Sequence, residues 1–318
     1  MRTIRDTSGV NPVHVRTLQE IVRCQSFSRA AETLHLSQPA VSHHVRHLEE
    51  EVGQPLLERV GKRALPTPAG EVLLAHAARA FAELEAARQS LQELRGRVAG
   101  RLSVGTGATA STYLLPPLLR RLHARHPDLE LVVVTGNSAE MVAAVAASHL
   151  DLAVVTLPVN RGAAVTVTPL MLDPLVAITP SAAPWRRRGA LTAAELARHP
   201  LILYERGGTI RRVIDEWFRR SGVVPRIAME LGNGEAIKKM VAAGLGLSVT
   251  SAMSLAAEVR ARELIARPLA PPLGRRLGIV RRRDRAASPA LRAFLDGLEA
   301  LAVRRRGSRR ASATPSRA

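Results

Sequence analysis

Residues that can read the edges of DNA bases lie close together in the stretch Ser26–Gly70. Val41, Val45 and Leu48 recur at helical spacing, which predicts a helix with one apolar face. The same spacing turns four polar side chains away from the core, namely Gln38, Ser42, His43 and Arg46. Glutamine can pair with adenine, arginine with guanine or phosphate, and serine with a base edge or a phosphate oxygen. We therefore interpret this face as a reader of the DNA major groove, and the alternative is an ordinary solvated helix face.

The helix that carries this face has a clear predicted start. Ser37 is an N-cap candidate, and Pro39 falls in the first turn, where its missing N–H has no cost. A shorter helix with Ala30 and Ala31 on one side comes before it, and we expect Ser28 to cap that helix. A positively charged, hairpin-like segment follows and contains Arg59, Lys62 and Arg63.

Three segments, SFSRAAETL, LSQPAVSHHVRHLEEEVG and LERVGKRALPTPAG, resemble the winged helix-turn-helix of the LysR-type transcriptional regulators. The resemblance is nearly continuous from about Val13 to Ala77 and implies base contacts from the helix and phosphate or minor-groove contacts from the wing. We assign DNA binding to Ser37, Gln38, Pro39, Ser42, His43, Arg46, Arg59, Lys62 and Arg63.

The sequence departs from the pattern of this family at three positions. Leu57 stands where phenylalanine is usual, a tolerable volume change at an apolar position. His43 stands where arginine or a similar long donor is common, so the base read there can differ. Pro66 stands where the wing strand usually carries leucine, and because proline cannot donate to a strand ladder, we expect a shorter wing.

Composition limits the remaining possibilities. The chain of 318 residues has room for one small domain and one larger domain of about two hundred residues. With 46 Lys and Arg against 27 Asp and Glu, the formal net charge is +19, which favours a polyanion such as nucleic acid as partner. Cys24 is the only cysteine, so an internal disulfide and a multi-cysteine metal site are excluded. No signal peptide or membrane-spanning run is apparent, which predicts a cytoplasmic protein without membrane contact.

A long helix is predicted after the wing, reaching about Arg95. Its apolar residues recur at spacings of three and four, at Leu74, Ala77, Phe81, Leu84 and Leu91. We interpret this stripe as the seam of a paired helix in a homodimer or homotetramer, with packing against its own domain as the alternative. Two paired copies would read a roughly palindromic DNA site. Gly96 and Gly100 then suggest a flexible joint.

From Arg101 onward, short apolar runs alternate with helical stretches, as in parallel βα units. Among these elements we expect a helix over Tyr113–Arg125 and strands at Leu175–Thr179 and Leu277–Val280. This half resembles the effector-binding half of LysR-type regulators, which shares its fold with periplasmic solute-binding proteins. The predicted fold is α/β overall, with an N-terminal all-α winged helix-turn-helix, a long linker helix and a C-terminal two-lobed α/β domain of periplasmic-binding-protein type. The predicted parts are a flexible arm at 1–12, the DNA-binding domain at 13–68, the linker helix and hinge at 69–100, the two-lobed domain at 101–303 (lobe I at about 101–165 and 266–303, lobe II at about 166–265) and a basic disordered tail at 304–318.

Hydroxyl and amide side chains follow several of the predicted strands in this half. Ligands of parallel sheets bind beyond the carboxyl ends of strands, near helix N-termini that favour anions. We assign effector binding to Thr106, Thr109, Asn137, Ser138, Thr156, Arg206 and Thr209. Family analogy supports four of these positions, namely Thr109, Asn137, Thr156 and Thr209. Each polar residue could instead be a simple helix cap, and Arg206 an exposed loop residue that otherwise favours an anionic metabolite.

The sequence does not indicate an enzyme. Gly246-Leu247-Ser248-Val249 begins like a nucleophile elbow, but Thr250 replaces the closing glycine. His43, His44 and His47 lie close together without an evident carboxylate or cysteine to complete a metal site, so we expect no cofactor and no metal. We predict a regulator that binds double-stranded promoter DNA and a small-molecule effector, with RNA polymerase as a candidate partner. The alternative is a DNA-binding protein whose C-terminal half only mediates oligomerisation or protein contacts.

Overall fold

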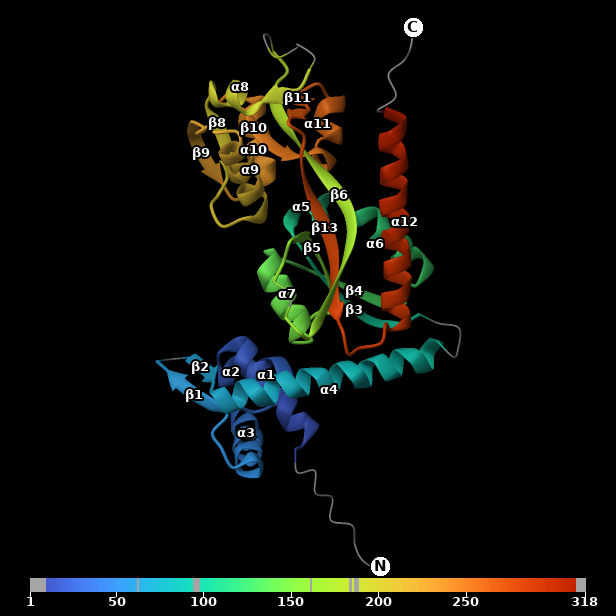
Figure 1. Ribbon diagram of the computed structural model, residues 1–318. Helices are drawn as coiled ribbons and strands as arrows, with labels where there is room; N and C mark the ends of the chain where they lie inside the picture. The colour runs from blue at the N-terminus through green and yellow to red at the C-terminus, as the bar shows by residue number, and fades with distance from the viewer. Residues whose placement is uncertain are drawn as a thin grey trace, which may run out of the picture. The chain divides into compact units, whose positions relative to one another are not determined.

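The computed structural model describes residues 10–61, 63–93, 98–160, 162–182, 185 and 189–312. The chain divides into two compact units, Met1–Glu85 and Ala86–Ala318 (Figure 1). No described helix is long and apolar enough to span a membrane.

The N-terminal unit is a helical domain with a small hairpin. Its elements are α1 (Pro12–Cys24), α2 (Phe27–Leu34), α3 (Gln38–Val52), β1 (Leu57–Val60), β2 (Arg63–Pro66) and the beginning of α4 (Pro68–Glu93). Ser37 caps α3 as expected, since its side chain accepts a hydrogen bond from the Ala40 N–H at 3.3 Å. The cap of α2 is Ser26 and not Ser28, because Phe27 packs against the core and the helix begins there.

Two apolar clusters hold this unit together. Ile21, Val41 and Val45 pack together between α1 and α3. Leu18, Leu48 and Leu56 form the second cluster, against which the first half of α4 packs through Leu74, Ala77 and Phe81. Packing within the unit therefore explains the first half of the predicted stripe.

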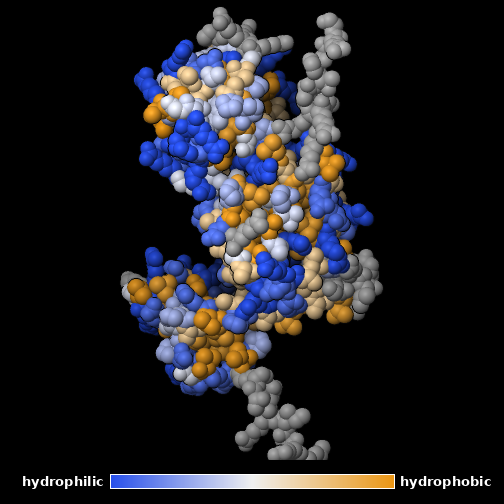
Figure 2. Space-filling model, viewed as in Figure 1, coloured by the Kyte–Doolittle hydropathy of each residue, from blue (hydrophilic) through white to orange (hydrophobic). Residues whose placement is uncertain are grey.

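The second half of α4 has no comparable packing. Leu84 and Leu91 are 65% and 63% exposed, so their part of the stripe is available to another surface. The space-filling view also shows hydrophobic surface beside hydrophilic surface on the N-terminal unit (Figure 2). Pairing of this helix between subunits stays a prediction.

The wing is a regular antiparallel hairpin. Its ladder runs from Val60 opposite Arg63 to Leu57 opposite Pro66. Pro66 thus lies in the last pair of the ladder, where the missing N–H does not interrupt the strand, and the expected shortening does not occur. Lys62, in the turn, lies outside the described residues.

The C-terminal unit is a two-lobed α/β structure, which confirms the predicted fold class. Lobe I contains β3 (Gly100–Thr106), α5 (Ala108–Tyr113), α6 (Pro116–Arg125), β4 (Leu129–Thr135), α7 (Ser138–Ala146), β5 (Leu152–Leu157) and α12 (Pro289–Ser312). Lobe II contains β7 (Leu191–Thr192), α8 (Ala193–Ala197), β8 (Leu201–Tyr204), α9 (Thr209–Arg220), β9 (Ile227–Leu231), α10 (Gly234–Ala242), β10 (Ser248–Ser251), a 3-10 turn η1 (Ala252–Ser254), α11 (Ala256–Arg260), β11 (Leu264–Arg267) and β12 (Leu269–Ala270).

Two long strands, β6 (Val165–Pro180) and β13 (Leu273–Arg282), connect the lobes. They pair with each other in a seven-stranded sheet of order β10-β6-β13-β5-β3-β4, in which β11 also pairs with β6. Figure 1 shows both strands running between the two lobes. The lobes therefore share one continuous sheet.

Three local predictions in this unit differ from the structure. The helix expected over Tyr113–Arg125 begins only at Pro116, as α6, and Tyr113 is the last residue of the preceding α5, because proline favours the first turn of a helix. The strand expected at Leu175–Thr179 is the end of the much longer β6. Disorder was expected from Arg304, whereas α12 continues to Ser312. The helix continues because arginine and alanine favour helix, and because Arg305 donates a hydrogen bond to the Tyr113 carbonyl at 2.9 Å.

Gly70 offers a test of the packing in the N-terminal unit. A Cβ at this position would lie 2.1 Å from the Leu56 backbone carbonyl. We expect Gly70→Ala to destabilise the unit by about 1–3 kcal/mol, because the start of α4 must move away from Leu56. Hydrogen exchange in α1–α3 should rise, while Gly162→Ala, where a Cβ meets nothing within 4 Å, serves as the control. Unchanged hydrogen exchange in Gly70→Ala would show that the unit accommodates the added methyl group without loss of stability.

Candidate functional site

The first candidate site is the solvent-facing side of α3. Gln38, His43 and Arg46 are exposed and Ser42 is half-buried, as the helical spacing predicts. Gln38 Nε2 donates a hydrogen bond to Ser42 Oγ at 3.0 Å, so the two groups satisfy each other in this structure. Binding to a base would exchange this bond for contacts of similar strength, and the face can therefore be read without a large rearrangement.

The other predicted DNA-binding residues flank this face. Ser37 and Pro39 are exposed at the start of α3, and Arg59 and Arg63 are exposed on the wing. The Arg59 guanidinium carbon lies 5.8 Å from the centre of the Phe27 ring. This cation–π contact connects the wing to α2 and orients one of its cations.

The second candidate site is a cavity of about 460 Å³ between the two lobes. Its walls include the ends of β3, β4 and β5 in lobe I and the starts of α9 and α10 in lobe II. The cavity brings together five of the seven residues predicted to bind an effector: Thr109, Asn137, Ser138, Thr156 and Thr209.

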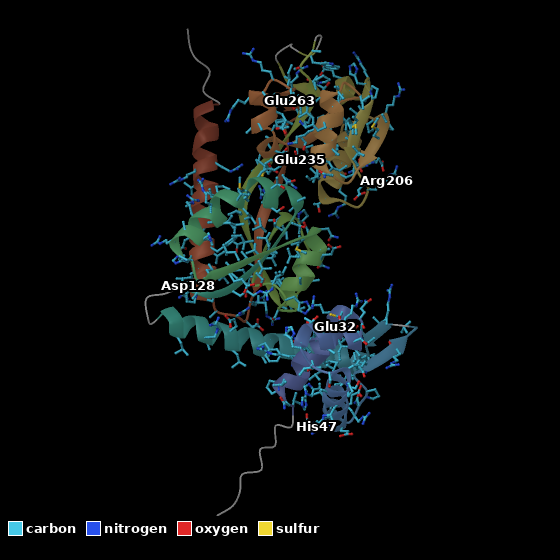
Figure 3. All side chains as sticks on the ribbon, turned by 180° about the vertical axis from the view of Figure 1, so that it is seen from behind. Glu32, His47, Asp128, Arg206, Glu235 and Glu263 are labelled. Carbon is cyan, nitrogen blue, oxygen red and sulfur yellow. The ribbon has the colours of Figure 1, made fainter. Side chains whose placement is uncertain are left out.

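Two of the predicted effector residues lie outside this cavity. Thr106 is fully buried and donates its hydroxyl hydrogen to the Val154 carbonyl at 2.9 Å, so it supports the sheet instead. The Arg206 side chain, labelled in Figure 3, is 80% exposed, has its Nε 3.5 Å from Glu230 and is not among the residues that line the cavity. The exposed-loop alternative for Arg206 therefore agrees with the structure.

Two of the residues in the cavity also have structural roles. The Asn137 side-chain oxygen Oδ1 accepts a hydrogen bond from the Glu140 N–H at 2.9 Å and takes part in a capping box. Ser138 Oγ accepts a hydrogen bond from the Thr156 N–H at 3.2 Å and joins the start of α7 to β5. The side chains at this wall are thus held in fixed positions.

A buried ion pair lies at the base of the cavity, and the sequence did not reveal it. Arg275 on β13 donates from Nε to Asp173 on β6 at 2.8 Å and from Nη1 to Thr156 Oγ1 at 3.3 Å. Asp173 is fully buried and also accepts a hydrogen bond from Ser251 at 2.7 Å. Arg275 was missed because the strand was expected to begin only at Leu277.

A second group of side chains links the lobes beside the cavity. Lys238 on α10, whose side chain is 2% exposed, donates to the Tyr113 hydroxyl at 2.8 Å and to the Ser254 carbonyl at 2.9 Å. It also pairs with Glu258 and, at 2.9 Å, with Glu235 (Figure 3). Tyr113 belongs to lobe I, so this lysine bridges the two lobes.

Two further residues shape the lobe II wall. Burial raises the pKa of the Tyr204 hydroxyl, which hydrogen-bonds Thr250 Oγ1 at 2.7 Å. Arg211 donates to the Tyr204 carbonyl and to Glu230, and this hydrogen bond lowers the pKa of the Glu230 carboxyl. Tyr204 therefore stays protonated and Glu230 stays charged near neutral pH.

Both halves of the chain match known families. The family described as "Bacterial regulatory helix-turn-helix protein, lysR family" matches residues 13–71, and "LysR substrate binding domain" matches residues 95–302. A RuBisCO operon transcriptional regulator of Allochromatium vinosum is 34% identical over 282 residues, covering 88% of this chain and 92% of the relative. The HTH-type transcriptional regulator CbbR of Xanthobacter flavus is 36% identical over 280 residues, covering 86% and 83%.

Solved structures show the same architecture. A full-length OxyR from Pseudomonas aeruginosa superposes with a TM-score of 0.73 at 28% identity, covering 92% of this chain and 94% of that one. The regulatory domain of CcmR from Synechocystis PCC6803, solved in complex with 2-PG, gives a TM-score of 0.58 at 27% identity, covering 64% of this chain and 97% of that domain.

The buried ion pair can be tested by removing one partner. We expect Arg275→Gln to destabilise the C-terminal unit by about 3–5 kcal/mol, because Asp173 is left as an uncompensated buried charge. Adding Asp173→Asn should recover part of this loss. The free energy of unfolding is measured in urea, with tryptophan fluorescence as the signal, because both tryptophans of the chain lie in this unit. Arg276→Gln, at the exposed neighbour, is the matched control. If the losses of stability from Arg275→Gln and Asp173→Asn simply add in the double variant, the two residues are not a coupled pair.

Proposed function

The chain belongs to the LysR family of bacterial transcriptional regulators, and we propose that it controls a RuBisCO operon in response to a small anionic metabolite. Support for the operon comes from two relatives named as RuBisCO operon transcriptional regulators, which are 34% and 33% identical along most of both chains. Support for the metabolite comes from the cavity between the lobes. The two parts of the proposal rest on different residues and are tested separately.

The observation that carries the DNA-binding part is the free face of α3. A rigid apolar core orients Gln38, Ser42 and Arg46 outward, and a capped helix start places them at the end that enters a groove. The wing arginines lie beside this face, and the net charge of +19 attracts the phosphate backbone. Specific contacts and general attraction are thus supplied by separate groups.

We propose that two chains read a roughly palindromic operator. Leu84 and Leu91 continue the apolar stripe of α4 beyond its packing on the N-terminal unit, and both are exposed. Pairing of α4 with α4 of a second copy would cover these leucines and present two reading helices together. A homodimer is the smallest assembly that both covers these leucines and presents two reading helices.

The cavity suits a small anion for reasons of size and charge. Its volume of about 460 Å³ falls within the range of about 300–1,000 Å³ that is usual for metabolite sites. Asn137 and Asn233 cap α7 and α10, whereas α9 begins at Gly208 without a side-chain cap. The first N–H groups of α9 are therefore available beside Thr209, where the helix dipole favours negative charge.

We propose that the bound anion shifts the balance between lobe arrangements. The Tyr113–Lys238 contact already joins the lobes at the cavity, and the shared strands β6 and β13 permit bending between them. An anion that contacts both walls binds a closed arrangement more tightly than an open one, and this difference in affinity drives the shift. In a dimer, such a shift changes the spacing of the DNA-reading units.

The reading face of α3 can be tested by truncating single side chains. We expect Ser42→Ala and Arg46→Ala to weaken binding to the DNA upstream of the gene's own start, by about 1–3 kcal/mol for each lost base contact. Affinity for this DNA and for unrelated DNA is measured over a salt series, because a loss of phosphate contact alone weakens both equally. Arg120→Ala, an exposed arginine on α6, controls for charge. Operator affinity that is unchanged in both variants would remove these residues from the reading face.

The cavity can be tested with 2-PG, the ligand of the CcmR regulatory domain, as the probe. We expect 2-PG to raise the unfolding temperature of the wild-type chain but not of Thr109→Trp, because the bulky ring fills the cavity. Operator binding should persist in Thr109→Trp, and Ala124→Trp on the exposed side of α6 is the control. A wild-type chain that responds to neither 2-PG nor inorganic phosphate would favour an oligomerisation or protein-contact role for this half.

A further inference from the structure

Two histidines and a glutamate come together on the surface of the N-terminal unit. His14 lies on α1, whereas His47 and Glu51 lie one turn apart on α3. One ring nitrogen from each histidine and one carboxylate oxygen all lie within 4.8 Å of one another. The cluster was not predicted from the sequence, because His14 lies on a different helix from His47 and Glu51. Figure 3 marks His47 on this unit.

The distances between the candidate ligand atoms already approach those found around a coordinated ion. Zinc bonds of 2.0–2.2 Å in a tetrahedral arrangement place two ligand atoms about 3.3 Å apart. His47 Nδ1 and Glu51 Oε1 are 3.4 Å apart. The His47 side chain is 46% exposed and the Glu51 side chain 21% exposed, so small rotations can bring them and His14 to one centre, and an ion can enter from solvent.

The surroundings of His14 also favour an additional ligand. Its Nδ1 is buried and has no hydrogen-bond partner among the described residues. Buried polar atoms are normally paired, so this nitrogen is an exception that a bound ion can resolve if the ring turns toward His47 and Glu51. Its ring stacks on His44 at 4.6 Å between centres and lies 5.2 Å from the centre of the His47 ring. His14 is thus already beside one of the other two proposed ligands.

We propose that His14, His47 and Glu51 bind one divalent transition-metal ion of the zinc class. Two imidazoles and one carboxylate are a donor set that such ions prefer over magnesium or calcium, and water would complete the coordination. The ion would join α1 to α3, the helix that carries the proposed base-reading residues. This site is separate from the effector cavity and does not depend on it.

Metal binding is tested on the full chain without a polyhistidine tag, after removal of metal by a chelator. Calorimetric titration with Zn²⁺ should show one ion per chain, and Co²⁺ should give the visible absorption of a nitrogen- and oxygen-ligated centre. We expect His47→Gln and Glu51→Gln each to weaken binding by more than the roughly 10–100-fold that loss of an outer-shell partner costs. His47 and Glu51 both reach the surface and the replacements are similar in size, so these variants should fold normally, whereas His14→Gln is checked first by circular dichroism.

Matched controls come from neighbouring exposed residues. Glu50→Gln on α3 and His76→Gln on α4 should bind Zn²⁺ like the wild type. Zn²⁺ should also raise the unfolding temperature of the wild type and of both controls, but not of His47→Gln. Equal affinity in wild type and His47→Gln, or binding that depends on His43 instead, would overturn the proposed ligand set. A stoichiometry of zero would overturn the site itself.

Discussion

The C-terminal unit depends on the pairing of β6 with β13. Both strands run through both lobes, and β5, β10 and β11 are attached to one or the other of them. Asp173 and Arg275 are register partners in this ladder, so their ion pair lies within the backbone pairing itself. Through Thr156 and Ser251 the same pair also contacts β5 and β10. A charge pair at this point fixes the register of two strands whose slippage would displace the walls of the cavity.

The N-terminal unit depends in a comparable way on the packing of α1 against α3. Ile21, Val41 and Val45 exclude water between the helices, which leaves the opposite side of α3 free for polar side chains. His14 and His47 come together because the same packing brings the two helices close. One apolar interface therefore positions both the base-reading face and the histidine–glutamate cluster, and the two adjoin on α3, where the ring centres of His43 and His47 are 6.2 Å apart.

Local signals in the sequence were enough to predict the helix-turn-helix. Ser37, Pro39 and the apolar spacing act within one or two turns, so they determine α3 without help from the rest of the chain. Five of the residues proposed to bind an effector line one cavity for the same reason, because the edge of a parallel sheet is defined by chain order. Thr106 and Arg206 were the exceptions, since Thr106 faces the sheet and Arg206 is an exposed loop residue.

The residues that the sequence did not reveal owe their positions to contacts between distant segments. Arg275 meets Asp173 across 102 residues, Lys238 meets Tyr113 across 125, and His14 meets His47 across the α1–α3 interface. In each case, one partner is an ordinary charged or aromatic residue whose neighbours in sequence give no hint of burial. The Asp173–Arg275 pair and the Tyr113–Lys238 contact also differ in their structural roles. The Asp173–Arg275 pair is deeply buried and holds the lobes to one sheet, whereas the Tyr113–Lys238 contact lies at the cavity and joins groups that separate when the lobes move apart. In the proposed lobe movement, opening would break the Tyr113–Lys238 contact before it disturbed the buried pair, so the strands would act as the hinge and the Tyr113–Lys238 contact would respond to closure.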